Sequence, residues 1–169
     1  MKTKNLLVGL AAACLLVTMG GCSAVSGLFG GGDAQRDPDD QITSGGNINA
    51  FSLHVGDCLI SSDLDSSFSD VPAVPCTEAH DSEVFYLFDM PDGTFDEDAI
   101  DDAAGQECPR ALNSYVGPNY ASVGSEGLDW SYFVPTEDSW ANGDREVDCV
   151  AYAVSGTNEL TSSVKGLGD

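Results

Sequence analysis

One short stretch of the sequence gathers several side chains that could take part in chemistry. Residues 74–85 read VPCTEAHDSEVF, which places Cys76, His80, Asp81 and Glu83 within eight positions. Thiolate, imidazole and carboxylate groups are all zinc ligands, and a histidine beside a carboxylate can act in acid–base catalysis. The stretch therefore has three interpretations: a metal site, a catalytic pair, or a structural part of a small exported domain.

The first two interpretations find little support elsewhere in the sequence. Zinc sites usually combine ligand pairs from two clusters, and the only other histidine is His54. The acid-rich runs that begin at Asp63 and Asp96 lack the sixth-position glycine and the final glutamate of a calcium loop. No G-x-S-x-G or H-E-x-x-H motif occurs, and adjacent residues such as His80 and Asp81 point to opposite faces of a strand. We therefore expect no catalytic residue, no metal and no cofactor.

The N-terminus predicts export. Lys2 and Lys4 precede an apolar run over residues 6–17, and the sequence MGGC then ends at Cys22. The run is too short to span a bilayer, and its flanks are typical of a signal peptide. The small residues before Cys22 resemble the lipobox of bacterial lipoproteins. We therefore predict a signal peptide over residues 1–22 and a lipid on Cys22 that anchors the protein outside the cell membrane. Plain secretion is the alternative.

Composition and charge limit what the exported part can bind. Residues 23–50 are rich in Gly, Asp, Ser and Asn and show neither helical nor strand periodicity. This predicts a flexible tether, with order beginning at Phe51. Beyond Cys22 only four basic residues accompany 28 acidic ones, a net charge of −24. Nucleic-acid binding needs clustered Lys and Arg, so we expect no nucleic acid among the partners.

Four cysteines remain in the exported part: Cys58, Cys76, Cys108 and Cys149. An even number in an oxidising compartment predicts two disulfides, for which three pairings are possible. Cys58 and Cys76 lie on neighbouring short segments of strand character, so we favour Cys58–Cys76 and Cys108–Cys149. Because a disulfide sulfur is not a metal ligand, this pairing weakens the metal interpretation of Cys76.

The remaining sequence predicts an α+β domain of one sheet and one helix. Strands are expected at 51–60, 71–78, 82–90, 127–135 and 145–154. Pro72 and Pro75 are expected to keep the second strand at a sheet edge or on an irregular path. Asp96 can cap a helix that is kinked or split at Pro109. This order predicts a single domain over residues 51–166, an antiparallel sheet covered by one main helix.

Basic residues are so scarce that Arg145 stands out. We expect its guanidinium group to form a bidentate ion pair with Asp57, Asp81 or Glu83. In this structural interpretation the charged side chains hold the starts of strands in place. Trp140 is expected to pack in the core or at its rim.

Five pieces of the sequence together resemble one known family. They are VGDCL at 55–59, VPCTEAHDSEV at 74–84, Cys108, WANGDREVDC at 140–149 and LTSSVKG at 160–166. In this order they resemble the septum-formation domain of exported lipoproteins and single-pass membrane proteins of actinobacteria. The resemblance spans about residues 53–166 and departs from the family pattern at Ala79, where proline is usual. It implies paired cysteines, no known reaction and no cofactor. It also implies that six residues act together: Asp57, His80, Asp81, Glu83, Trp140 and Arg145.

These inferences predict a non-enzymatic envelope protein. We expect the lipid-anchored domain to bind another envelope protein or a wall component, with a role in septum formation or envelope assembly. The alternative is an extracellular domain that binds a metal or small ligand through His80, Asp81 and Glu83. An envelope hydrolase is a further alternative.

Overall fold

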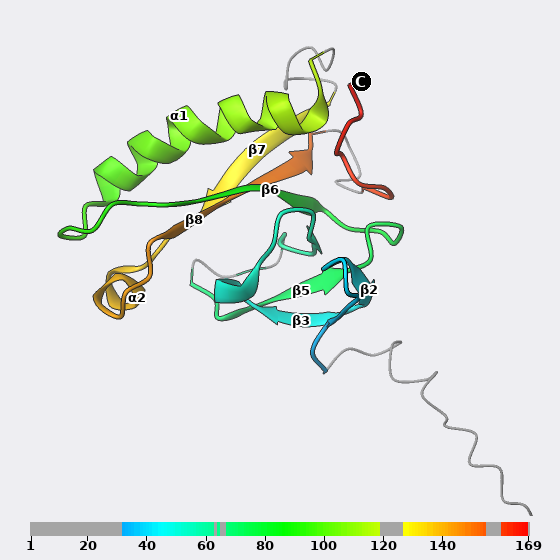
Figure 1. Cartoon of the computed structure of the whole chain (residues 1–169), viewed down its shortest axis with the longest axis horizontal. Helices are drawn as coiled ribbons and strands as arrows, with labels where there is room; N and C mark the ends of the chain where they lie inside the picture. The colour runs from blue at the N-terminus through cyan, green and yellow to red at the C-terminus, as the bar shows by residue number, and fades with distance from the viewer. Residues whose placement is uncertain (1–31, 63, 65–66, 119–126, 155–159, 169) are drawn as a thin grey trace, which may run out of the picture.

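A six-stranded antiparallel sheet and one long helix make up most of the fold (Figure 1). The computed structural model describes residues 32–62, 64, 67–118, 127–154 and 160–168. The predicted signal peptide, the lipid site Cys22 and residues 23–31 lie outside the described residues. The prediction of a single α+β domain, with an antiparallel sheet and one main helix, is confirmed.

The strands of the large sheet follow one another in an order that differs from their order in the chain. Across the sheet they are β3 (Gly46–Asn49), β5 (Asp70–Val74), β4 (Cys58–Leu59), β6 (Ser82–Asp89), β8 (Glu146–Ala153) and β7 (Leu128–Phe133). A separate two-stranded sheet pairs β1 (Gln35–Arg36) with β2 (Ile42–Ser44). The helices are α1 (Glu97–Val116) and the short α2 (Glu137–Ala141), with a 3₁₀ turn at Ala50–Ser52.

Helix α1 forms where the apolar periodicity predicts it. The Asp96 side chain accepts a hydrogen bond from the Ala99 amide and caps the first turn. One face of the helix is buried, at Ile100, Ala104, Cys108, Leu112 and Val116. Pro109 lies inside one continuous helix, so the predicted split into two segments does not occur. Pro109 has no N–H group, so the helix loses one backbone hydrogen bond there. The free-energy cost is offset by the burial of its neighbour Cys108, which a disulfide also joins to the sheet.

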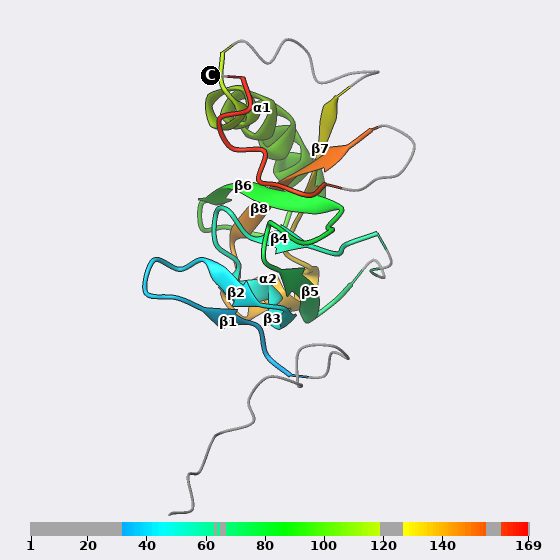
Figure 2. The same ribbon diagram turned by 90° about the vertical axis from the view of Figure 1, so that its right-hand side faces the viewer.

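Strand β8 contributes side chains to both faces of the sheet. On one face Val147, Cys149 and Ala151 pack under α1, and the Cys108–Cys149 disulfide joins the helix to the strand. On the other face Val150 belongs to a second core with residues of β3, β4, β5 and β6. Phe68, which lies between β4 and β5, packs on this second face, edge-on against Phe133 of β7 with ring centroids 4.9 Å apart. Figure 2 shows α1 on one side of β6 and β8, and the N-terminal strands on the other.

The folded part begins well before Phe51, so the predicted tether over 23–50 is wrong for residues 32–50. Strand β3 pairs with β5 through Ile48 opposite Val71, and both residues are buried. Gly46 lies against the chain at Gly32, because a Cβ on Gly46 would stand 2.4 Å from the Gly32 carbonyl oxygen. Gly46 is thus required by close backbone approach. The strand predicted at 51–60 shrinks to the two residues of β4.

Strand β5 lies inside the sheet, between β3 and β4, and the expectation that its prolines keep it at an edge is wrong. The Pro72 carbonyl accepts a hydrogen bond of 2.9 Å from the Ile60 amide, just beyond the end of β4. In an antiparallel strand the N–H and C=O of one residue point to the same side. The position where Pro72 lacks an N–H group therefore faces the end of β4. The hydrogen bonds between β5 and β3 do not need that group.

Loss of the Cys108–Cys149 disulfide should lower the free energy of unfolding by about 4 kcal/mol. This bond links residues 41 positions apart, against 18 for Cys58–Cys76, so its removal releases more conformational entropy in the unfolded chain. Urea unfolding of Cys108→Ala/Cys149→Ala and of Cys58→Ala/Cys76→Ala, each against the wild type, measures the two losses. A smaller loss for the 108/149 pair would contradict the prediction.

Candidate functional site

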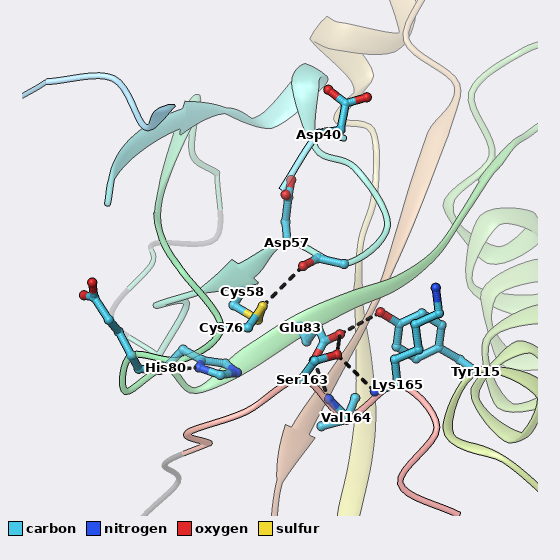
Figure 3. The surroundings of a disulfide bond; sticks show 12 residues. Asp40, Asp57, Cys58, Cys76, His80, Glu83, Tyr115, Ser163, Val164 and Lys165 are labelled. Atoms are coloured by element: carbon cyan, nitrogen blue, oxygen red, sulfur yellow. Dashed lines mark hydrogen bonds between the residues drawn. A yellow bond between two sulfur atoms is a disulfide. The ribbon is translucent and has the colours of Figure 1, made fainter. Parts of the chain in front are cut away.

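The VPCTEAHDSEVF stretch surrounds the Cys58–Cys76 disulfide, which joins β4 to the segment after β5 (Figure 3). The predicted pairings, Cys58–Cys76 and Cys108–Cys149, are both confirmed. The two sulfur atoms of Cys58 and Cys76 and a carboxylate oxygen of Glu83 lie within 4.8 Å of one another. Because the sulfur atoms are bonded to each other, they do not offer thiolates to a metal.

Asp57 is buried and pairs with Arg36 of β1. The Arg36 Nη1 and Nη2 atoms each donate a hydrogen bond of 2.6 Å to a different Asp57 oxygen, and the His54 amide donates to Oδ2 at 2.8 Å. The hydrogen bond to Asp57 raises the pKa of Arg36 above its ordinary value. The ion pair thus fastens the small N-terminal sheet to the main one. The expectation that Arg145 would pair with Asp57, Asp81 or Glu83 is wrong.

Asp81 holds the turn that follows β4. Its carboxylate accepts hydrogen bonds from the amides of Ser61 and Ser62 at 2.8 and 2.9 Å, and from the hydroxyls of Ser61 and Ser82. Burial opposes its ionisation, but the hydrogen bonds from Ser61 and Ser62 outweigh that effect and hold the pKa of Asp81 below its ordinary value. Asp81 is therefore a structural anchor for the entry to the β4–β5 loop.

Glu83 is completely buried and joins three parts of the chain (Figure 3). Its Oε1 atom accepts hydrogen bonds from the Tyr115 hydroxyl at 2.6 Å and the Ser163 hydroxyl at 2.7 Å, and Oε2 accepts from the Val164 amide at 2.7 Å. Burial, and then the Glu83 carboxylate, raise the pKa of Tyr115. The described residues supply Glu83 with neutral donors and with no ion-pair partner. Strand β6, helix α1 and the C-terminal segment thus meet at one carboxylate.

His80 is buried, and its ring forms no hydrogen bond with these carboxylates among the described residues. Its Nδ1 lies 2.8 Å from the Glu78 carbonyl oxygen, which only accepts, so Nδ1 carries the proton. The backbone of His80 forms a two-way bridge with Leu160, again holding the C-terminal segment. The Nε2 atom is buried and has no hydrogen-bond partner among the described residues. His80 and Asp81 therefore do not form a dyad.

Trp140 and Arg145 form a separate cluster at the α2 end of β8. The Arg145 guanidinium carbon lies 3.9 Å from the centre of the Trp140 ring, and its Nη1 donates to the Trp140 carbonyl at 2.9 Å. The Trp140 indole N–H donates to the Gly93 carbonyl at 2.9 Å, and Phe95 packs edge-on against the ring. Arg145 also pairs with Asp92 at 3.3 Å. Trp140 packs at the rim of the core, and the W-x2-G-D-R motif clamps α2 to the turn before α1.

Of the six residues that the family resemblance groups together, Asp57, His80 and Glu83 lie around the Cys58–Cys76 disulfide, but their side chains have different hydrogen-bond partners (Figure 3). Asp57, Asp81 and Glu83 each serve a different segment, and Trp140 and Arg145 stabilise another. Sequence reasoning missed the partners of the carboxylates: Arg36, Tyr115, Ser163 and Val164. Basic residues are scarce, so Arg36 could have been singled out in the same way as Arg145. It was not considered as a partner because it lies within residues 23–50, which were predicted to be a flexible tether.

Comparison with protein families identifies the relatives of this chain. A family model described as septum formation matches residues 39–149. The chain belongs to the septum formation family. The matched part of this septum formation domain runs from the segment before β2 into β8 and includes all four paired cysteines and the Trp140–Arg145 motif. No curated protein and no solved structure matches the chain. Among the described residues, none of the helices is long and apolar enough to cross a membrane.

Replacing Arg36 by methionine should lower the free energy of unfolding by about 3 kcal/mol, because it leaves the buried Asp57 carboxylate without its counter-charge. Urea unfolding measures the loss. Arg110→Met is the matched control, since Arg110 is exposed and pairs with Glu107 on the same helix. Adding Asp57→Asn should recover part of the loss, and equal losses for Arg36→Met and Arg110→Met would refute the role of the pair.

Glu83→Gln should loosen the C-terminal segment. Both carboxylate oxygens of Glu83 accept hydrogen bonds, whereas the NH₂ group of glutamine can only donate. This NH₂ group would therefore face either the two hydroxyl groups or the Val164 amide, and hydrogen bonds would be lost there. Amide exchange at Val164 should become at least about tenfold faster, from the loss of a hydrogen bond to a charged group. Hydrogen exchange followed by NMR tests this, with Glu107→Gln on α1 as control. Unchanged protection of Val164 would rule out the anchoring role.

Proposed function

We propose that this chain is an exported, lipid-anchored envelope protein whose septum formation domain binds another envelope component and catalyses no reaction. The proposal is based on the observation that the buried carboxylates accept hydrogen bonds from within the domain. Asp57, Asp81 and Glu83 are each engaged by internal donors that fasten a chain segment or a turn. In this arrangement the charged groups build a rigid platform, as expected of a domain that acts through its surface.

Two further features support export and anchoring. The domain is joined by two disulfides, which form and persist in oxidising compartments outside the cytoplasm. The sequence before it has the charge, apolar run and terminal Cys22 of a lipoprotein signal. Membership of the septum formation family supports a role in division, and the net charge of −24 beyond Cys22 disfavours a nucleic-acid partner.

The geometry does not favour the two alternatives drawn from the HD-x-E motif. A metal or small ligand would need His80, Asp81 and Glu83 to converge, but their polar atoms engage Glu78, the 61–62 turn and the C-terminal segment respectively. For a hydrolase, the His80 imidazole would have to reach substrate, yet His80 is only 2% exposed. The interaction domain therefore remains the better-supported proposal.

The proposal is tested in the organism that encodes the chain, after deletion of the gene. Complementation with the wild type should restore normal septum placement and cell length, whereas Cys22→Ala should release the protein from the membrane fraction and fail to restore division. Cys14→Ala is the matched control, because Cys14 lies within the apolar run of the signal and not at the lipobox. Fractionation and microscopy provide the two readouts.

Each readout can contradict one part of the proposal. Membrane association of Cys22→Ala equal to that of Cys14→Ala would overturn the lipid anchor. Normal division in the deletion strain would overturn the role in septum formation. Hydrolysis of cell-wall material by the purified chain, above a heat-denatured control, would overturn the absence of catalysis.

A further inference from the structure

A groove of about 330 Å³ lies on the sheet face opposite α1. Its walls are the 3₁₀ turn and the β4–β5 loop on one side, and β7, α2 and β8 on the other. We call it the acidic groove and define it by three aromatic and three acidic residues: Phe51, Phe68, Phe133, Asp144, Glu146 and Asp148. The carboxylates of Asp57, Asp81 and Glu83 do not belong to this set.

Asp148 is the unusual member of the acidic groove. It is only 6% exposed, and its register neighbours on the two flanking strands are the apolar residues Leu87 and Phe133. Its Oδ1 atom is buried and receives no hydrogen bond from the described residues. The Asp148 side chain shares a hydrogen bond with Glu146, which leaves Oδ1 as the oxygen without a partner. An unsatisfied buried polar atom is costly to the fold, so Oδ1 favours a further partner. The carboxyl group lines the groove, so such a partner can reach it from solvent.

The charges around Asp148 favour a cation as that partner. Burial, and then the neighbouring Glu146 and Asp144, raise the pKa of Asp148 to about 8. Burial, then Asp89 and Asp144, also raise the pKa of Glu146. The positive groups nearby do not neutralise this cluster. His54 has a weak influence on Glu146, and the Arg145 guanidinium is directed at the Trp140 ring and Asp92.

The shape and lining of the acidic groove distinguish an organic cation from a metal ion. Among the described residues, the carboxylates of Asp144, Glu146 and Asp148 do not gather their oxygens within the short distances of a metal shell. Aromatic rings, in contrast, attract organic cations and pack against alkyl chains. Phe68 of one wall contacts Phe133 of the other, and Phe51, which is 61% exposed, also lines the groove. The volume suits a single long side chain.

We propose that the acidic groove binds an alkylammonium group of the lysine type, with the ammonium beside Asp148 and Glu146 and the alkyl stem along Phe68 and Phe133. The inference rests on the proposed function, because it names the chemistry that the interaction domain recognises. The same group could come from a lysine of a protein partner or from a free diamine. Those two sources are separated by experiment.

Titration of the purified full chain, followed by ¹H–¹⁵N NMR, tests the proposal. N-acetyl-lysine methylamide should give saturable shifts at amides of β7, β8 and the β4–β5 loop, with a Kd on the order of 1 mM for so small a probe. The Nε-acetylated form, which has lost the charge, should bind at least tenfold more weakly. Pentane-1,5-diamine in a parallel titration tests the free-diamine source: tighter binding than the lysine derivative favours it, and weaker binding favours a protein lysine.

Asp148→Asn separates a binding role from a structural one. It should weaken binding of the lysine derivative at least tenfold and at the same time raise the melting temperature at pH 7.5 by a few degrees. The folded chain keeps the Asp148 proton up to about pH 8, whereas the unfolded chain loses it near pH 4. Stability therefore falls as pH rises through this window, and asparagine removes that loss. The difference in melting temperature should vanish near pH 4.

The matched control is Asp102→Asn, an exposed aspartate on α1, which should change neither binding nor the pH dependence of melting. Glu146→Gln is the second groove variant, should Asp148→Asn prove unstable, and it should also weaken binding. Absence of saturable shifts, equal affinity for the two lysine derivatives, or binding of calcium in place of the ammonium would overturn the proposal. These titrations use purified protein, so their failure would not affect the results on anchoring and division. Failure of the anchoring or division experiments would likewise not affect the titrations.

Discussion

The buried carboxylate of Glu83 is the constraint on which the arrangement of this septum formation domain depends. It lies in the central part of the sheet, where the chain offers almost no basic residues, and it is stabilised by two hydroxyl groups and one backbone amide. Desolvating a charge without these donors would cost several kcal/mol. The end of α1, the C-terminal segment and β6 must therefore be placed together before Glu83 can be buried. The position of Ser163 and Val164 follows from this requirement, although they stand 80 and 81 residues further along the chain.

The same shortage of bases shapes the rest of the fold. Asp57 has the one guanidinium available to it, that of Arg36, and that pairing draws the N-terminal strands onto the main sheet. Asp81 instead accepts hydrogen bonds from amides and a hydroxyl of the turn after β4. The carboxylates of Asp57, Asp81 and Glu83 lie where donors from other segments converge, so each of these three carboxylates also records a long-range contact. The disulfides act in the same direction by tying β4 to the segment after β5 and α1 to β8.

Local patterns in the sequence predicted the elements with strong periodicity and failed where distant contacts decide. The run over β6, the stripe of α1 and the cysteine spacing gave the antiparallel sheet, its helix and both disulfides. Strands β1 to β3 have two to four residues each and a single buried side chain, Ile48, so they carry no periodic signal. In β8 the side chains of Val147, Cys149 and Ala151 face α1, so the charged Asp148 between them is expected in solvent on the other face. It is buried because Phe68 and its loop cover that face, and no local pattern predicts such a cover.

Asp148 differs from the other buried acids in one physical respect. Asp57, Asp81 and Glu83 receive their donors from the chain, and these contacts favour the folded state. Asp148 keeps an unsatisfied oxygen beside two further acids, and its pKa near 8 means that a proton neutralises it at physiological pH. A cation that enters the acidic groove must displace this proton, so its affinity rises with pH until the carboxyl is ionised. An alkylammonium group stays charged throughout that range, since its own pKa is about 10.4. The fold thus gives up some stability at one carboxyl, which a cation can bind in exchange for the proton.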